Sequence, residues 1–205
     1  MINTTPLTYL SEAARSETCC DSMRRTFIKL AVVAGAGMPL HALAAGEVDA
    51  ANARPQAGDR FVFAEPGREG VEITPADLSV GGAQVQAWPM DSASKTVRSG
   101  SRLNRVLLVR FDPTILDEET RAHAAEGIVA YSAVCTHAQC FVTGWNAEQK
   151  VLHCPCHQSD YDPRHNAKVV AGPAPRALPA LPLKILDGVL TAAGPFLGRV
   201  GMRPS

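Results

Sequence analysis

Short apolar runs separated by turn residues dominate this chain, and they predict many short β-strands. Residues 60–63 form the first run, and residues 84–88 alternate in the way of a half-buried strand. The continuous apolar run at 106–109 predicts a buried strand. Residues 183–190 predict a hairpin, because Asp187-Gly188 supplies a two-residue turn between two apolar runs.

One stretch favours a helix instead. Residues 114–126 follow a turn that starts at Asp112-Pro113, and their acidic residues come early, where the helix dipole favours negative charge. Residues 127–131 predict a further strand, and the polar residues 91–102 predict a loop. The pattern as a whole therefore predicts a mainly β protein with one short helix.

The amino-acid composition agrees with this prediction, and the charge balance gives information on binding partners. The chain has 205 residues, of which 46% are hydrophobic, which is enough for one domain with modest extras. Its 16 Gly and 15 Pro favour turns over long helices. Lys and Arg number 20, and Asp and Glu also number 20, so the formal net charge of +0 gives no indication of a nucleic-acid surface.

The chain is predicted to divide into three parts. Residues 1–45 form an N-terminal sorting region, and residues 46–58 are a linker without periodicity. The folded domain then occupies residues 59–200.

The N-terminal region resembles a twin-arginine export signal. Residues 22–29, which read S-M-R-R-T-F-I-K, contain paired arginines, then two apolar residues and a lysine. The uncharged residues 30–46 are slightly short for a membrane span and suit an export signal better, although an amphipathic helix is the alternative. Cleavage is expected near Ala44 or Ala45, after the small-x-small pattern, unless the segment stays as an anchor. Met23 is a candidate translation start.

Two cysteine–histidine boxes carry the chemistry. The first reads C-T-H-A-Q-C at 135–140 and the second reads C-P-C-H-Q-S at 154–159, with sixteen residues between His137 and Cys154. Two thiolates and two imidazoles on paired loops suit a two-iron cluster, with the cysteines Cys135 and Cys154 on one iron and the histidines His137 and His157 on the other.

Both boxes, in order and spacing, resemble the Rieske iron–sulfur family, in its disulfide-bearing, high-potential branch. The resemblance is close over about residues 127–190. It implies one [2Fe-2S] cluster per chain and an antiparallel β base domain with a small cluster-binding subdomain, about residues 131–175, inserted in it. It also implies that the spare cysteines Cys140 and Cys156 form a disulfide. The twin-arginine route exports proteins already folded around their cofactor, to a side oxidising enough to keep that bond.

Further roles are implied by the same resemblance. Ser159 and Tyr161 match positions whose hydroxyls donate hydrogen bonds to cluster or cysteine sulfur and raise the reduction potential. A proline-rich loop that covers the cluster corresponds to four residues, Gly172, Pro173, Ala174 and Pro175.

A zinc site is the alternative interpretation, since zinc also takes two Cys and two His. Zinc fingers pair Cys with Cys and His with His, whereas each box here has one of each, and zinc leaves Cys140 and Cys156 without a role. Other Cys and His residues are predicted to be incidental. Cys19 and Cys20 precede any fold, and His123 and His165 lie in polar stretches where solvated side chains are expected.

The predicted function is one-electron transfer, with no catalytic residue in this chain. The first hypothesis is the iron–sulfur subunit of an exported oxidoreductase resembling arsenite oxidase, on the periplasmic side, soluble or anchored. It would take electrons from a catalytic large subunit and pass them to a cytochrome c or a copper protein. The second is the Rieske subunit of a membrane quinol–cytochrome c oxidoreductase, with a cytochrome b complex on the donor side.

Two departures from the quinol-oxidising pattern favour the first hypothesis. Ala138-Gln139 stands where quinol-oxidising relatives usually have Leu-Gly, and Gln158 stands where they usually have Gly. The second position implies a backbone geometry that Gln adopts less readily than Gly. A bulky residue there, and the text Y-S-A-V-C at 131–135, resemble the arsenite oxidase small subunit.

Overall fold

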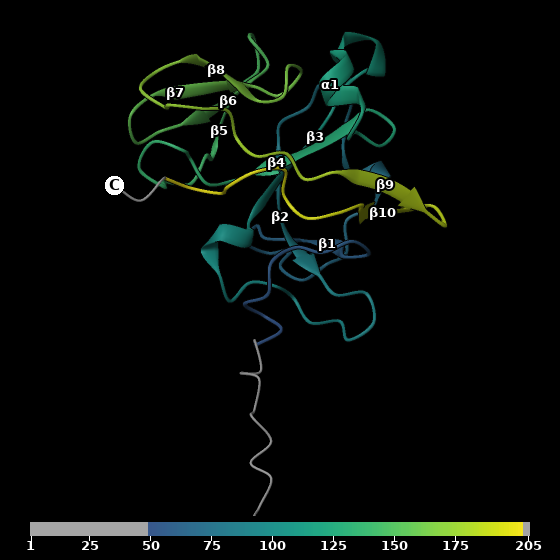
Figure 1. The fold of residues 1–205 in the computed structure, drawn as a ribbon. Coiled ribbons are helices and arrows are strands. Elements are labelled where there is room, and N and C mark those ends of the chain that lie inside the picture. The colour runs from purple at the N-terminus through teal and green to yellow at the C-terminus, as the bar shows by residue number, and fades with distance from the viewer. Residues whose placement is uncertain (1–48, 203–205) are drawn as a thin grey trace, which may run out of the picture. The chain divides into compact units, whose positions relative to one another are not determined.

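The computed structural model describes residues 49–202, and Figure 1 traces their path. The twin-arginine segment, the cleavage pattern, Cys19 and Cys20 lie outside the described residues. Within 49–202 the chain forms ten strands, one α-helix and three 3₁₀ helices. No helix in this range is both long enough and apolar enough to cross a bilayer.

The first sheet belongs to a base layer and pairs its strands in chain order. Its four antiparallel strands are β1 (Arg60–Phe63), β2 (Val85–Met90), β3 (Val106–Arg110) and β4 (Ile128–Ser132). The hairpin of β9 (Leu183–Leu186) and β10 (Val189–Ala192) joins this layer, because the amide of Ala192 donates to the carbonyl of Asp59 at the start of β1. The mainly β, antiparallel fold and the strands predicted at 60–63, 84–88, 106–109 and 127–131 are confirmed.

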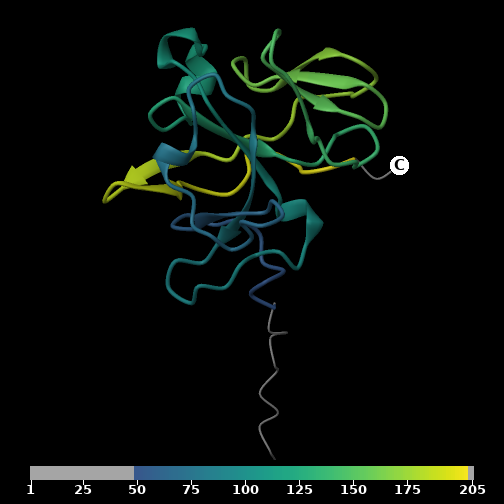
Figure 2. The same ribbon diagram turned by 180° about the vertical axis from the view of Figure 1, so that it is seen from behind.

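A second sheet is inserted between β4 and β9. It consists of β5 (Gly144–Asn146), β6 (Val151–Cys154), β7 (Ser159–Asp162) and β8 (Lys168–Ala171), again in chain order and antiparallel. After β8 the chain returns to β4, where the amide of Ser132 donates to the carbonyl of Pro179 and the amide of Leu181 to that of Ala130. Figures 1 and 2 both place this sheet and the β9–β10 hairpin on opposite sides of β3 and β4.

Alternation along β3 and β4 explains why these strands form the centre of the molecule. Leu107 and Tyr131 point into one core cluster, which also contains residues of β6 and β7, whereas Leu108 and Ile128 point into another cluster with β1 and β10. Both strands are therefore buried on both faces, as their continuous runs of apolar residues predict. This double burial fixes β4, which leads directly into the first box.

The hairpin turn follows its predicted geometry. Leu186 pairs with Val189 across the two-residue turn, and both Asp187 (φ 52°) and Gly188 (φ 77°) have the positive φ that a type I′ turn requires.

The prediction of a helix over 114–126 is wrong in extent. The α-helix α1 covers only Glu118–Arg121, after a 3₁₀ turn at Pro113–Ile115; the other 3₁₀ turns are Pro75–Asp77 and Arg102–Asn104. Two aspartates each cap a separate turn: the Asp112 carboxylate accepts from the Thr114 amide, and that of Asp117 from the Thr120 amide. The chain between the two turns is extended, so a continuous helix cannot form.

The expectation that His123 is solvated is also wrong. Its side chain is buried, and its Nε2 has no hydrogen-bond partner among the described residues. The short helix turns it toward β9, where its carbonyl accepts from the Leu183 amide. His165, in contrast, is partly exposed and its Nδ1 lies 3.1 Å from an oxygen of Asp162.

Residues 49–58, which include most of the predicted linker, lie against the base layer. The Asn104 side chain donates to the carbonyl of Ala53, and the amide of Gly58 donates to that of Ala192. Next to them, Asp59 and Arg98 form a buried ion pair with an N–O distance of 2.7 Å.

Candidate metal centre

The two boxes fold into two turns of the same design, which we call the first loop (residues 135–140) and the second loop (residues 154–159). In each, the carbonyl of the leading cysteine accepts a hydrogen bond from the amide four residues later: Gln139 to Cys135, and Gln158 to Cys154, both at 3.1 Å. Each turn ends on a glutamine in the left-handed region, with φ of 59° at Gln139 and 57° at Gln158. The unusual backbone geometry expected at Gln158 is confirmed.

The strands fix where the loops begin. The first loop follows β4, and the second joins β6 to β7, so that Cys154 and Ser159 are paired residues of a hairpin. Both leading cysteines, Cys135 and Cys154, are free thiols and are 2% and 1% exposed. Burial, and then the neighbouring Cys135 thiol, raise the pKa of the Cys154 thiol, so that without metal it keeps its proton. Metal binding by such thiols would release protons.

The two histidines also meet, on the more accessible side of the loops. The rings of His137 and His157 lie edge to face, with 4.6 Å between their centroids and an interplanar angle of 90°. His157 is exposed, whereas His137 is half-buried and its Nδ1 is a buried nitrogen without a hydrogen-bond partner within residues 49–202. A buried polar atom without a partner is costly, and it is the arrangement expected of a nitrogen that binds a metal.

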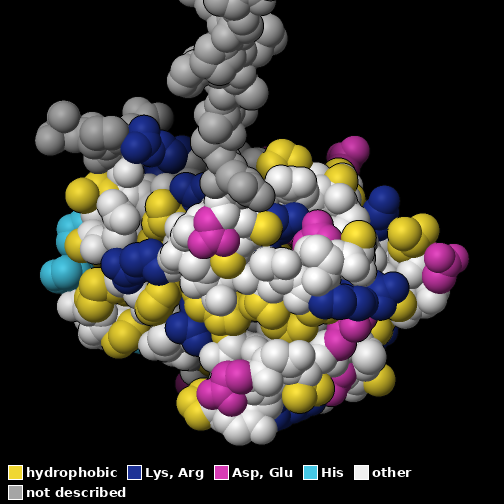
Figure 3. All heavy atoms as spheres, turned by 90° about the horizontal axis from the view of Figure 1, so that it is seen from below, with side chains coloured by type: hydrophobic (Ala, Val, Ile, Leu, Met, Phe, Trp, Pro, Cys, Tyr) yellow, Lys and Arg dark blue, Asp and Glu magenta, His cyan; other side chains and the backbone are white. Residues whose placement is uncertain are grey.

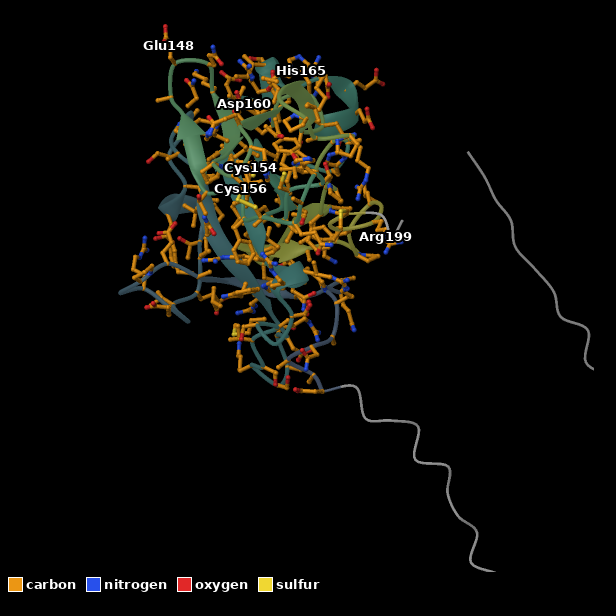
Figure 4. All side chains as sticks on the ribbon, turned by 90° about the vertical axis from the view of Figure 1, so that its left-hand side faces the viewer. Glu148, Cys154, Cys156, Asp160, His165 and Arg199 are labelled. Carbon is orange, nitrogen blue, oxygen red and sulfur yellow. A yellow bond between two sulfur atoms is a disulfide. The ribbon has the colours of Figure 1, made fainter. Side chains whose placement is uncertain are left out.

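A disulfide between Cys140 and Cys156 connects the two loops. It is the pair expected from the family resemblance, and the bond is visible beside Cys154 in Figure 4. Because it joins the end of the first loop to the middle of the second, it holds the paired thiols and the paired imidazoles in register.

Tyr161 reaches from β7 to the first loop. Its hydroxyl lies 3.1 Å from the Cys135 sulfur and accepts a hydrogen bond from the Thr136 amide at 3.3 Å. Burial, and then the contact with Cys135, raise the pKa of Tyr161, so the phenol keeps its proton. Since the hydroxyl oxygen accepts from Thr136, its hydrogen can point at the sulfur.

Ser159, the last residue of the second loop, is fully buried. Its hydroxyl oxygen accepts from the Ala174 amide at 3.2 Å, which leaves its own hydrogen to donate. The hydroxyls of Ser159 and Tyr161 thus both lie at the loops.

The loop Gly172–Pro175 lies against the second loop. Gly172 has φ of 83°, and a Cβ there would collide with backbone atoms of Gln158 and Ser159, so only glycine allows this close approach. Pro173 and Pro175 then line, with His137, a surface cavity of about 470 Å³.

Other residues at the site have no sequence pattern that marks them. The Thr136 hydroxyl donates to the carbonyl of Arg176 at 2.7 Å, and the Arg102 guanidinium donates to the carbonyl of Gln139 at 2.8 Å. Gly201, near the C-terminus, lies against the Gln139 side chain. These contacts join distant parts of the chain, so the local sequence around each residue does not predict them.

The donor set divides into pairs. No group of three or more His, Cys, Asp or Glu in residues 49–202 is placed to hold a single metal ion. The residues do provide what a two-iron cluster requires, namely a buried thiol pair and an imidazole pair with one orphaned ring nitrogen.

Comparison with known proteins gives one family. The Rieske [2Fe-2S] domain matches residues 87–182. A Haloferax mediterranei protein named as the Rieske subunit of a respiratory nitrate reductase is 43% identical over 106 residues, which are 51% of this chain and 47% of that protein. The cytochrome bc1 complex Rieske iron–sulfur subunit of Streptomyces lividans is 34% identical over 133 residues, which are 63% of this chain and 78% of that protein.

Among solved structures, the ferredoxin of carbazole 1,9a-dioxygenase from Nocardioides aromaticivorans IC177 matches with a TM-score of 0.40 and 19% identity, over 60% of this chain and 93% of that one. The matched part of the chain spans less than half of the Haloferax relative.

The left-handed glutamines allow a stability test. A residue with a Cβ in the left-handed region costs about 1–2 kcal/mol, and a glycine costs roughly 0.5–1 kcal/mol in chain entropy. We therefore expect Gln158→Gly to leave the free energy of unfolding unchanged or to raise it by up to about 1 kcal/mol. Gln158→Val should lower it by more than about 1 kcal/mol, because a β-branched side chain tolerates this region least. Denaturant unfolding of the metal-loaded protein measures both.

Gln149 provides the matched control, since it is exposed and its φ is not positive. Gln149→Gly should not stabilise the protein. An equal gain from both glycine variants would contradict the assignment of strain to Gln158.

Proposed function

Because the chain belongs to the Rieske [2Fe-2S] family, we propose that it carries single electrons as the iron–sulfur subunit of an oxidoreductase complex. The cofactor of this family is a [2Fe-2S] cluster, and this domain binds one. When bound, the cluster supplies a one-electron couple whose potential is raised by histidine ligation. The observation that carries the proposal is that two turns joined by a disulfide carry a pair of buried thiols and a pair of imidazoles in contact with each other.

Four side chains would hold the cluster in this proposal. The thiolates of Cys135 and Cys154 would bind one iron, and ring nitrogens of His137 and His157 the other. The buried Nδ1 of His137 supports this division, since metal ligation would give that atom its missing partner. The loop Gly172–Pro175, which lies against the second loop, would cover the cluster.

Two hydroxyls would set the potential. Tyr161 donates toward the Cys135 sulfur, and Ser159, at the end of the second loop, has a hydrogen free to donate. Hydrogen bonds to sulfur stabilise the more negative, reduced state, and so favour electron uptake.

Export to the periplasmic side by the twin-arginine route is part of the proposal. Two features support it: the paired arginines Arg24 and Arg25 in the sequence, and the disulfide Cys140–Cys156, a bond that persists in oxidising compartments.

For the complex, we propose a catalytic large subunit as electron donor, in the manner of arsenite oxidase, and a soluble cytochrome c or copper protein as acceptor. The sequence at 131–135 and the glutamine at 158 support it, and the Haloferax relative is named as the Rieske subunit of a respiratory nitrate reductase.

The second candidate is the Rieske subunit of a quinol–cytochrome c oxidoreductase. The similarity to the Streptomyces lividans subunit of the cytochrome bc1 complex favours it. Purification of the native complex separates the two: co-purification with a cytochrome b and loss of turnover with quinol-site inhibitors would select this candidate over the first.

Metal analysis tests the cluster itself. We expect two irons and two acid-labile sulfides per chain, a coloured oxidised protein, and a paramagnetic signal after reduction with dithionite. His157→Cys should remove the native spectrum, because it replaces an imidazole ligand by a thiolate. One zinc per chain with no sulfide would exclude an electron-transfer role.

The tyrosine hydroxyl gives a test of the potential. Tyr161→Phe should keep the cluster and lower its reduction potential. One hydrogen bond to a charged group is worth about 1.5–3 kcal/mol, which on a one-electron couple is roughly 65–130 mV as an upper range. Ser159→Ala should act in the same direction. Protein-film voltammetry measures both.

Tyr131→Phe is the matched control, because Tyr131 is equally buried but its hydroxyl donates to the carbonyl of Pro163 instead of to sulfur. It should destabilise the protein without moving the potential. If the Tyr161→Phe and Tyr131→Phe variants had the same reduction potential, the proposal that Tyr161 raises the potential would be refuted.

The export proposal predicts the effect of a charge-conserving change. Replacing Arg24 and Arg25 by lysine should leave the protein in the cytoplasm, since the export route reads the arginine pair itself. Cell fractionation with antibody detection measures this. A double variant that still reached the periplasmic fraction in full would refute the twin-arginine route, and a Lys29→Arg variant serves as the control.

A further inference from the structure

Acidic residues are absent from several long stretches of the chain, and parts of these stretches lie near the first loop. Residues 92–111, 163–186 and 188–202 contain no Asp or Glu but carry ten of the 20 Lys and Arg residues. Residues 127–147, which include the first loop, contain no acidic residue either. Although the formal net charge is +0, acidic and basic residues are therefore unevenly distributed along the chain.

Four arginines from different parts of the chain gather at the first loop. The Arg102 guanidinium donates to the carbonyl of Gln139 and lies 4.7 Å from the centre of the Phe141 ring. Arg54 and Arg199 line, together with Gln139, a hollow of about 440 Å³. Arg176 lines the cavity of about 470 Å³ that contains His137. Each arginine thus lies beside His137 or beside the end of its loop.

The hollow has the character of a protein-binding surface. Apolar side chains of Leu103, Phe196 and Met202 line it together with the arginines, and Met202 also lines the cavity at His137. None of the residues that line either cavity is acidic. Apolar contact surface combined with arginine is typical of protein interfaces, and a charged rim steers the approach of the partner.

The pictures agree with this distribution. In Figure 3 the edge that carries the histidines shows basic and apolar side chains, while the Asp and Glu side chains lie away from it. In Figure 4, Arg199 and Glu148 lie on opposite sides of the disulfide cysteine Cys156. Five acidic residues instead lie around α1, at positions 112, 117, 118, 119 and 126.

We propose that the first loop, with Arg54, Arg102, Arg176 and Arg199, is a docking surface for the acidic face of a partner protein. The inference rests on the proposed function, because the surface includes His137, where an electron would leave or enter. Attraction to a basic patch accelerates the encounter and orients the partner with its acidic face toward the histidines.

Binding of a charged peptide tests the surface directly. The probe is a fluorescent decaglutamate peptide, and its anisotropy reports binding to the folded, metal-loaded protein. We expect binding that weakens with salt, and no binding of the matching decalysine peptide. Arg54→Gln/Arg199→Gln should weaken decaglutamate binding by about three- to tenfold, as expected for two exposed charges.

The control removes the same net charge elsewhere. Arg121 on α1 and Lys184 on β9 are both exposed, and Arg121→Gln/Lys184→Gln should change the affinity by less than about twofold. Equal losses in the two double variants, or tighter binding of decalysine, would overturn the proposal. This measurement needs only the folded protein. Peptide binding therefore tests the docking surface even if the centre held zinc and the proposed function failed.

Electron-transfer kinetics then connect the surface to the redox centre. The reduced protein gives one electron to ferricyanide, which becomes ferrocyanide, or to the cationic tris(phenanthroline)cobalt(III), which becomes cobalt(II). We expect the ferricyanide rate to fall at least about threefold as salt screens the patch, and the cobalt rate to rise. Arg54→Gln/Arg199→Gln should flatten both dependences, whereas the control variant should not. A cluster that reacts with both oxidants at rates independent of salt would refute the docking surface and leave the electron-transfer function intact.

Discussion

The site depends on one constraint, which is that two turns separated by residues 141–153 must lie close to each other. The disulfide Cys140–Cys156 provides the covalent part of this constraint, and the strands provide the rest. Strand β4 is buried on both faces and delivers the first loop, while β6 and β7 pair Cys154 with Ser159 around the second. The same pairing puts Tyr161 opposite Leu152, from where its hydroxyl reaches Cys135 across the interface between the loops.

The pairing of loops also gives the centre two unlike sides. The thiols lie inside, almost without exposure, next to the buried hydroxyls of Ser159 and Tyr161. The imidazoles lie toward the surface, with His157 exposed. A partner protein can therefore approach the histidine side and not the cysteine side. The basic residues beside the first loop lie on this approachable side, so the geometry that buries the sulfur also decides where electrons are exchanged.

Much of this arrangement could be predicted from sequence, because its chemistry is local. Each box is contiguous, and the strands with continuous or alternating apolar text were predicted at the correct positions. Strands β5 to β8 were not predicted. The residues of β5 and β8 are half-buried or exposed, β6 has only two apolar residues before His153, and three of the four residues of β7 are polar although most of that strand is buried. The helix over 114–126 was overestimated because capping at Asp112 and Asp117 competes with helical periodicity. His123 and the arginine surface depend on tertiary contacts that no local pattern records.

The insertion of the second sheet between β4 and residues 179–181 has a consequence for how the protein folds. Strands β5 to β8 pair only with neighbours in sequence, so this meander has low contact order, whereas the hydrogen bond from Ser132 to Pro179 closes a loop of nearly fifty residues. Sequence-local hairpins form fast, and distant closure is slow. The second loop would thus acquire its shape early in folding, on a nascent module, while Cys135 arrives opposite it only once the ends of that module are clamped on β4. Assembly of the metal centre would then be the last stage of folding, and only correctly folded molecules would complete it.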